Sequence, residues 1–186
     1  MEKTPNANRK HIVIYGKTNA GKSSLLNAVI GEKIASVSSK SQTTRTRITG
    51  IKTIDDTQLV FMDTPGLHMP KNILSNHMLN AVRESVADID VVVFMADCTK
   101  KLSNQEEHML SDLSSGKTHL IYVLNKIDLL ENKSDLVPII SELSGKYNFD
   151  SIIPISVTEN NGVDIVVSEV MKFASDSPHF FPDDMI

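Results

Sequence analysis

The sequence has little of what stabilises secreted or membrane-spanning proteins. Its 186 residues include one cysteine and no tryptophan, and only 5% of them are aromatic. A single cysteine excludes an intramolecular disulfide framework and fits a reducing compartment. The longest apolar run, 91–96, is far shorter than the roughly 20 residues of a membrane-spanning helix. Because the polar segment 1–10 also contains no apolar stretch of signal-peptide length, we expect a soluble protein of the cytoplasm.

An excess of charge of one sign is also missing. The net charge is −4, with 23% charged and 40% hydrophobic residues. This balance is typical of a globular protein and gives no overall attraction to nucleic acid or anionic membranes. The length fits one ordinary domain. Cys98 falls at the end of the apolar run 91–96, so we expect a buried and unreactive thiol.

Short apolar runs alternate with amphipathic segments along the chain. Strands are predicted at 11–15, 48–54, 58–63, 91–96, 119–124 and 152–155, and helices at 23–30, 73–86, 104–113, 135–147 and 163–174. Nearly continuous apolar strands are buried on both faces, so the sheet should be mainly parallel and covered by helices. We predict a three-layer α/β/α fold with about six strands, one of them antiparallel. The tail 176–186 differs in composition, and either caps this domain or begins something further.

Residues 16–23 match the phosphate-binding loop (P-loop) pattern G-x-x-x-x-G-K-[ST] at every fixed position. A predicted strand precedes them and a predicted helix begins at their end, which is the context that this motif requires. The helix N-terminus and the backbone N–H groups attract phosphate oxygens. Lys22 is expected to reach the β- and γ-phosphates, and the Ser23 hydroxyl to bind Mg²⁺. The predicted phosphate-binding residues are Gly16, Lys17, Thr18, Asn19, Ala20, Gly21, Lys22, Ser23 and Ser24.

A second motif, Asp63-Thr-Pro-Gly66, ends a predicted strand and enters a loop. Asp63 can hold Mg²⁺ through a water molecule, and the N–H of Gly66 can contact the γ-phosphate. Alone, D-x-P-G is a turn motif, so its weight comes from following a phosphate loop. In the polar segment 31–47, either Thr43 or Thr44 is expected to complete the Mg²⁺ shell, and Thr44 is favoured.

The segment Asn125-Lys126-Ile-Asp128 follows another predicted strand and indicates which base is bound. An ionised aspartate only accepts hydrogen bonds, and guanine offers it two adjacent donors, N1–H and the exocyclic amine. Adenine presents no such pair on that edge. We therefore predict that GTP or GDP binds here. After the last predicted strand, Ser156, Val157 and Thr158 are placed where a backbone N–H would contact the guanine oxygen.

Taken together, these motifs resemble small GTPases of the translation-factor type, and one family fits more closely. Segment 40–51, with the run Q-T-T-R, resembles the Era GTPases, as do the stretches 63–68, 72–82 and 178–184. The similarity runs from His11 to the last residue, and its specific parts are the Q-T-T-R run and the F-P-x-D tail. Two positions depart from the usual Era pattern: Ala20 replaces a valine and Val157 an alanine.

The resemblance implies a Mg²⁺-dependent GTPase that assists assembly of the small ribosomal subunit. In this family a KH domain follows the GTPase domain and binds the 3′ end of the small-subunit rRNA. By resemblance, 1–175 corresponds to the GTPase domain, and 176–186 to the start of the linker to a KH domain that is missing from this sequence. We therefore expect weak or lost RNA binding, a monomer, and a cytoplasmic location, with peripheral attachment to the inner membrane left open.

The expected catalytic groups are Lys22, Thr44 and Gly66. The next residue is Leu67, whereas Ras-like enzymes have a glutamine there that orients the attacking water, so intrinsic hydrolysis should be slow. The resemblance also implies that Asn19 helps to bind K⁺ against the phosphates; alternatively, Asn19 only caps the loop through its own backbone. The function expected is a slow GTP-hydrolysing switch. The alternative is a guanine-nucleotide-binding module that signals by occupancy with negligible turnover.

Overall fold

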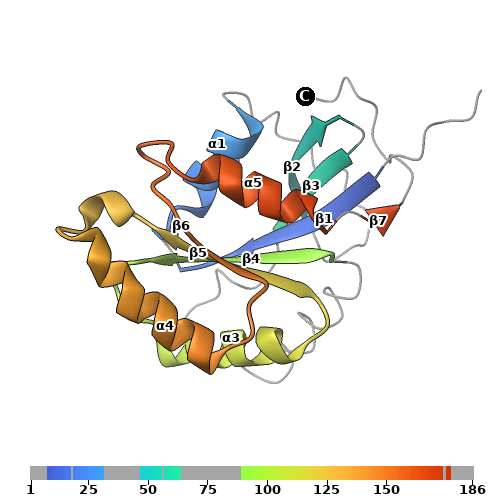
Figure 1. The fold of residues 1–186 in the computed structure, drawn as a ribbon. Helices are drawn as coiled ribbons and strands as arrows, with labels where there is room; N and C mark the ends of the chain where they lie inside the picture. Colours follow the sequence, from blue (N-terminus) through green and yellow to red (C-terminus); the bar gives the residue numbers. More distant parts are fainter. Residues whose placement is uncertain are drawn as a thin grey trace, which may run out of the picture.

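One central β-sheet organises the residues that the computed structural model describes, namely 8–17, 19–31, 47–55, 57–63, 89–173 and 175–176. Across the sheet the strand order is β2-β3-β1-β4-β5-β6 (Figure 1). The strands are β1 Asn8–Tyr15, β2 Arg47–Ile54, β3 Thr57–Asp63, β4 Val91–Asp97, β5 His119–Asn125 and β6 Ser151–Pro154. β2 pairs antiparallel with β3, and the pairs from β3 through β1, β4 and β5 to β6 are parallel. The predicted fold class is therefore confirmed.

A short strand that we did not predict joins this sheet. β7, Ser175–Asp176, pairs antiparallel with the beginning of β1, with Asn8 opposite Asp176. Its two polar residues carry no hydrophobic periodicity, so only the tertiary pairing reveals the strand. The predicted domain boundary at residue 175 stays a prediction, because 177–186 lie outside the described residues.

Helices cover both faces of the sheet, as Figure 1 shows: α1 and α5 pack on one face, α3 and α4 on the other. Their bounds are α1 Lys22–Ile30, α3 Asn104–Ser115, α4 Leu136–Lys146 and α5 Val163–Met171. The four predicted helices that lie in the described residues were right in type but not at every end: α5 ends at Met171, and 133–135 form a 3₁₀ turn before α4. The predicted helix 73–86 falls outside the described residues. None of the described helices is long and apolar enough to cross a membrane.

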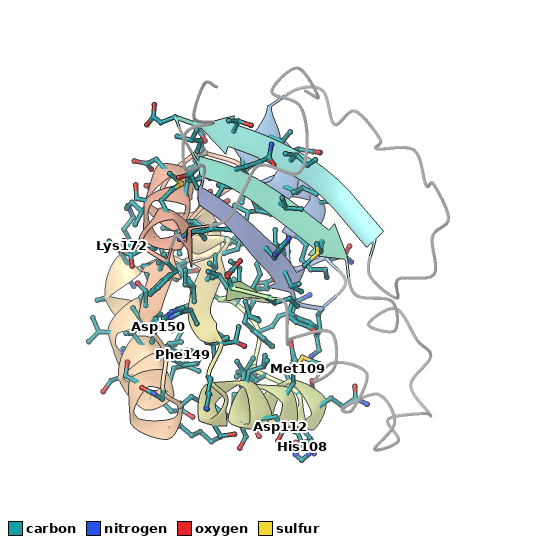
Figure 2. All side chains as sticks on the ribbon, turned by 90° about the vertical axis from the view of Figure 1, so that its right-hand side faces the viewer. His108, Met109, Asp112, Phe149, Asp150 and Lys172 are labelled. Atoms are coloured by element: carbon teal, nitrogen blue, oxygen red, sulfur yellow. The ribbon has the colours of Figure 1, made fainter. Side chains whose placement is uncertain are left out.

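Six consecutive residues of β4, 91–96, are apolar, and only its last residue, Asp97, is polar. Val91, Val93 and Met95 pack into the core under α1 and α5, whereas the alternate residues Val92 and Phe94 pack into the core under α3 and α4. The helices, in contrast, are apolar on one side only. In Figure 2, Met109 of α3 points toward the sheet and its neighbour His108 points away from it. Burial on both faces of the sheet therefore produces the continuous apolar pattern.

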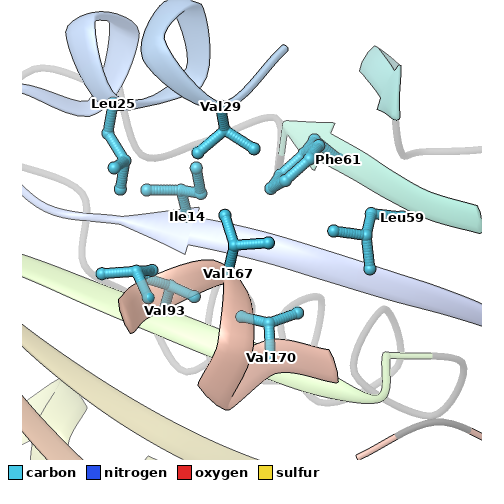
Figure 3. Close-up of a pocket in the computed structure, with 9 residues that line it drawn as sticks. Ile14, Leu25, Val29, Leu59, Phe61, Val93, Val167 and Val170 are labelled. Atoms are coloured by element: carbon cyan, nitrogen blue, oxygen red, sulfur yellow. The ribbon is translucent and has the colours of Figure 1, made fainter. Parts of the chain in front are cut away.

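The core contains a small apolar cavity between the sheet and the helices α1 and α5 (Figure 3). Only hydrophobic side chains line it: Ile14, Leu25, Val29, Leu59, Phe61, Val93, Val166, Val167 and Val170. Apolar cavities of this kind stay dry because they offer water no hydrogen-bond partner. We therefore regard the cavity as a packing gap rather than a ligand site.

Cys98 is buried, as predicted. Burial raises the pKa of its thiol, and the negative charge of Asp97 raises it further. Both effects disfavour the thiolate, which is the reactive form of cysteine. The thiol therefore belongs to the core of the domain.

Candidate functional site

The phosphate loop joins the end of β1, at Tyr15, to the beginning of α1, at Lys22. The residue before the helix is Gly21, which has no side chain to occupy the N–H groups of the first turn. The first turn contains no acidic residue, and Ser23 is exposed there. The backbone N–H groups of the first helical turn form a binding site for phosphate. Of the predicted phosphate-binding residues, Thr18 lies outside the described part of the chain.

Two glycines of this loop are required by close packing. A Cβ atom on Gly16 would lie 2.3 Å from the carbonyl oxygen of Met95 in β4. A Cβ on Gly21 would lie 2.3 Å from Nδ2 of Asn125, and Gly21 has a φ of +106°, which side chains rarely permit. The phosphate loop therefore packs directly against the ends of β4 and β5. A larger residue at position 16 or 21 would displace it.

Lys22 lies across the loop that precedes it. Its ammonium group donates to the carbonyl oxygens of Gly16 and Lys17, the latter at 2.7 Å. The backbone N–H of Ala20 donates to the same Lys17 oxygen at 3.1 Å. The positive charge of Lys22 therefore lies over the curve of the loop, which is where the sequence motif places the phosphates.

Asn125, the last residue of β5, connects three segments that are far apart in the sequence. Its Nδ2 donates to the carbonyl oxygen of Ala20 at 2.9 Å, and its Oδ1 accepts from the N–H of Val157 at 3.2 Å. Its side chain is almost fully buried, with 3% of its surface exposed. Asn125 therefore fixes the phosphate loop, the predicted base-recognition loop 125–128 and the loop 156–161 relative to one another.

Asp128 is held in position by Ser156. The hydroxyl of Ser156 donates to Oδ1 of Asp128 at 2.7 Å, and itself accepts from the N–H of Glu159 at 3.2 Å. Ser156 is fully buried, whereas Asp128 and the predicted residue Thr158 are exposed. An exposed carboxylate with one oxygen held by a buried hydroxyl can accept hydrogen bonds from a base on its solvent side.

Lys126 has a partner that sequence analysis did not identify. Its ammonium group lies 2.9 Å from Oδ2 of Asp97, the last residue of β4. The other carboxylate oxygen, Oδ1, accepts from the N–H and hydroxyl of Thr99 at 3.0 and 2.6 Å. Although burial acts to raise the pKa of Asp97, the hydrogen bonds from Thr99 and Lys126 hold it below its usual value. Asp97 is therefore ionised throughout the neutral range.

A second charged pair links the phosphate loop to α3. Lys17 lies 2.9 Å from Oε2 of Glu106, and the same oxygen accepts from the N–H and hydroxyl of Ser103 at 2.7 and 2.8 Å. Ser103 and Glu106 form a capping box at the N-terminus of α3. In the sequence, Ser103 and Glu106 are recognisable only by their S-x-x-E spacing. This spacing indicates the start of a helix and not a contact with the phosphate loop.

Only some of the predicted Mg²⁺ ligands lie in the part of the chain that the structure describes. β3 ends at Asp63, and the pairing of Met62 with Val13 brings that strand end to the edge of the sheet where the phosphate loop begins. Oxygen donors such as the Ser23 hydroxyl and a carboxylate suit Mg²⁺. Thr43, Thr44 and Gly66 lie outside the described residues, and those described contain no group of three acidic, histidine or cysteine side chains that could hold a metal by themselves.

The sheet order and these two loops define the fold of a P-loop GTPase. The chain belongs to the family described as "50S ribosome-binding GTPase", whose model matches residues 11–126. It is 40% identical over 175 residues to GTPase Era of Clostridioides difficile (strain 630), which covers 94% of this chain and 59% of that protein. GTPase Era of Ruminiclostridium cellulolyticum is 37% identical, with 94% of this chain and 58% of the relative covered.

Solved structures of Era give the same result. One is Era in complex with MgGDPNP and nucleotides 1506–1542 of 16S ribosomal RNA, which matches with a TM-score of 0.76 and 33% identity over 96% of this chain and 61% of its own. An Era variant from Aquifex aeolicus bound to GDP and AlF₄⁻ matches with the same TM-score, identity and coverage. This chain therefore spans about three-fifths of the length of these relatives.

Proposed function

We propose that this chain is a guanine-nucleotide switch that binds GTP and hydrolyses it slowly to GDP and phosphate. The observation that carries this proposal is the double hydrogen bond of Asn125 to Ala20 and Val157. These two bonds hold the phosphate loop and the base-recognition loop at a fixed separation. A ligand that meets both loops must have phosphates at one end and a base at the other, and is thus a nucleotide.

The base is guanine because of Asp128. The carboxylate is exposed, and Ser156 fixes one of its oxygens from the protein side. The guanine edge with N1–H and the exocyclic amine supplies the two donors that such a carboxylate accepts. The backbone of 156–158 lies beside it, since Val157 is bonded to Asn125. The remaining predicted contacts to the base, from Val157 and Thr158, are part of this proposal.

Mg²⁺ fits the donor set of the phosphate end. Ser23 is exposed in the first turn of α1, and β3 ends at Asp63 beside the strand that leads into the phosphate loop. The ion would be held by the Ser23 hydroxyl, by Thr44 and, through water, by Asp63, and would neutralise charge on the phosphates. Support comes from the Era structure that contains MgGDPNP. Asn19, exposed and with a left-handed φ of +66°, is the residue that would bind K⁺.

Hydrolysis is expected to be slow, because Leu67 cannot orient a water molecule. The same residue favours the alternative function, a nucleotide-binding module with negligible turnover. A single-turnover assay with GTP and Mg²⁺, run in K⁺ and in Na⁺ buffer, separates the two. The proposal predicts slow phosphate release that K⁺ accelerates. Release at equal rates in both buffers would remove the role of Asn19 in binding K⁺, and no release in either would leave only the binding module.

The partner that we propose is the small ribosomal subunit or its precursor rRNA, and the location the cytoplasm. The support is the similarity to Era proteins, one of which has been solved with a segment of 16S ribosomal RNA. The chain spans about three-fifths of those relatives, and by resemblance to the family we propose that most RNA contacts belong to its KH domain. The chain itself would contribute the nucleotide-dependent surface around 31–47 and 64–71.

A further inference from the structure

The backbone of Lys126 adopts a conformation that is uncommon for lysine. Its backbone φ is +70°, in the left-handed region where asparagine or glycine fit at lower cost than lysine. It begins the 3₁₀ turn that carries Asp128, directly after the strand β5. A lysine in this unfavourable conformation makes its side chain a candidate for a function.

The end of that side chain is fixed by a neighbouring strand. In the register of the parallel pair β4–β5, Asp97 lies opposite Asn125, so the carboxylate is next to the residue that follows, Lys126. The ammonium–carboxylate distance is 2.9 Å, and the Asp97 side chain is only 9% exposed. Lys100 also faces this carboxylate, but at 3.9 Å and with 67% of its side chain exposed. The bond to Lys126 is therefore the closer and more protected of the two.

The Asp97 carboxylate does not depend on Lys126 for its own position. Its Oδ1 is already held by two hydrogen bonds from Thr99, which leaves Oδ2 directed at the lysine. These bonds to Thr99 also form an Asx-turn, which would be a sufficient structural reason for an acidic or amide residue here. An asparagine would make the same turn, but would present its NH₂ group to the ammonium of Lys126.

We propose that Asp97 is a positioning residue for guanine-nucleotide binding and acts through Lys126. By anchoring the ammonium group, it orders the methylene stem of Lys126 beside Asp128 before the nucleotide arrives. The ordering entropy of a long side chain is then not lost at binding, so the complex is tighter and dissociates more slowly. This inference rests on the proposed function, because it needs a guanine nucleotide at the base-recognition loop.

The test is a double-mutant cycle in the 186-residue chain, with GDP and GTP dissociation constants and dissociation rates as the readout. Asp97→Asn should weaken both nucleotides roughly tenfold, about 1.4 kcal/mol, mainly through faster dissociation. Lys126→Met should weaken binding at least as much. In the Lys126→Met background, Asp97→Asn should have no further effect. In Asp97→Asn, saturating turnover should not change, so that KM rises and kcat stays constant.

The matched control is Lys100→Gln, which removes the other lysine facing Asp97 and should change affinity less than twofold. The ratio of GDP to inosine diphosphate affinity should be the same in Asp97→Asn and in the unmodified chain, because Asp128 remains the residue that recognises the base. Wild-type affinity in Asp97→Asn, or a tenfold loss that persists in the Lys126→Met background, would overturn the proposal. Failure of the unmodified chain to bind guanine nucleotides would instead overturn the proposed function. Melting temperatures without nucleotide identify any variant that fails to fold.

Discussion

At the scale of single residues, Gly21 lies at the point where the phosphate loop, α1 and β5 meet. It precedes the first turn of α1 and faces the amide of Asn125, whose bond to Ala20 joins the two loops of the site. No side chain fits between these groups. The site is thus assembled by close backbone packing before any ligand contributes.

This packing gives a prediction with a matched control. Gly21→Ala should lower the free energy of unfolding by about 1–3 kcal/mol and weaken nucleotide binding, because its Cβ displaces Asn125 and its φ is unfavourable for alanine. Gly145 lies within α4, and a Cβ added there would have no atom within 4 Å. Gly145→Ala should therefore stabilise the protein by about 0.5–1 kcal/mol. Urea denaturation measures both. Equal effects of the two substitutions would contradict the packing argument.

The residues that sequence analysis did not identify each contact a residue of another element. Asp97 and Glu106 act across elements, on Lys126 and Lys17, and neither contact leaves a local pattern in the chain. The residues of the phosphate loop and of 125–128 were found because one ligand requires several groups at fixed short spacings. Contacts that depend on how two strands or a loop and a helix are placed need the fold itself.

At the scale of elements, β1 and α5 are joined by a buried lysine. Lys10 of β1 has no exposed surface, donates to the carbonyl oxygen of Val170 near the end of α5, and lies 5.5 Å from the ring centre of Phe173. Phe173 in turn stacks on His119 of β5. Burial lowers the pKa of Lys10 to about 8, although the charge of Asp90 opposes this effect.

This pKa predicts how stability depends on pH. Between about pH 8 and 10.5 the unfolded chain keeps a proton on Lys10 that the folded chain releases, so folding should become more favourable as pH rises through this range. The free energy of unfolding, measured by urea denaturation for the unmodified chain and for Lys10→Met, should show the rise as a difference between the two curves. The exposed Lys172→Met is the control and should run parallel to the unmodified chain. Parallel curves for Lys10→Met would contradict the prediction.

Helices and strands were predictable from the sequence where they are buried on both faces or on one side only. β4 and β5 are buried on both faces and read as continuous apolar runs, and the helices show one apolar side. β7 was not predictable, because the two polar residues Ser175 and Asp176 become a strand only through their place beside β1. The start of α4 was placed one residue early, because the 3₁₀ turn at 133–135 continues into the helix with similar backbone geometry.

At the scale of the whole molecule, the sheet brings its functional loops to one edge. In a parallel sheet the carboxyl ends of the strands meet at the same side, and here these are the ends of β1, β4 and β5 with the loop after β6. The order β3-β1-β4 places the phosphate loop, which follows β1, between the ends of β3 and β4. The topology of the sheet therefore brings the loops of the candidate site together.

Exchanging the base is the sharpest test of whether Asp128 selects guanine while the phosphate loop binds the phosphates. Equilibrium binding of GDP and xanthosine diphosphate should be measured for the unmodified chain and for Asp128→Asn, which is isosteric and exposed. The unmodified chain should strongly prefer GDP. Asp128→Asn should lose affinity for GDP and gain affinity for xanthosine diphosphate, because the amide donates where the carboxylate accepted. An unchanged preference for GDP in Asp128→Asn would show that Asp128 does not select the base.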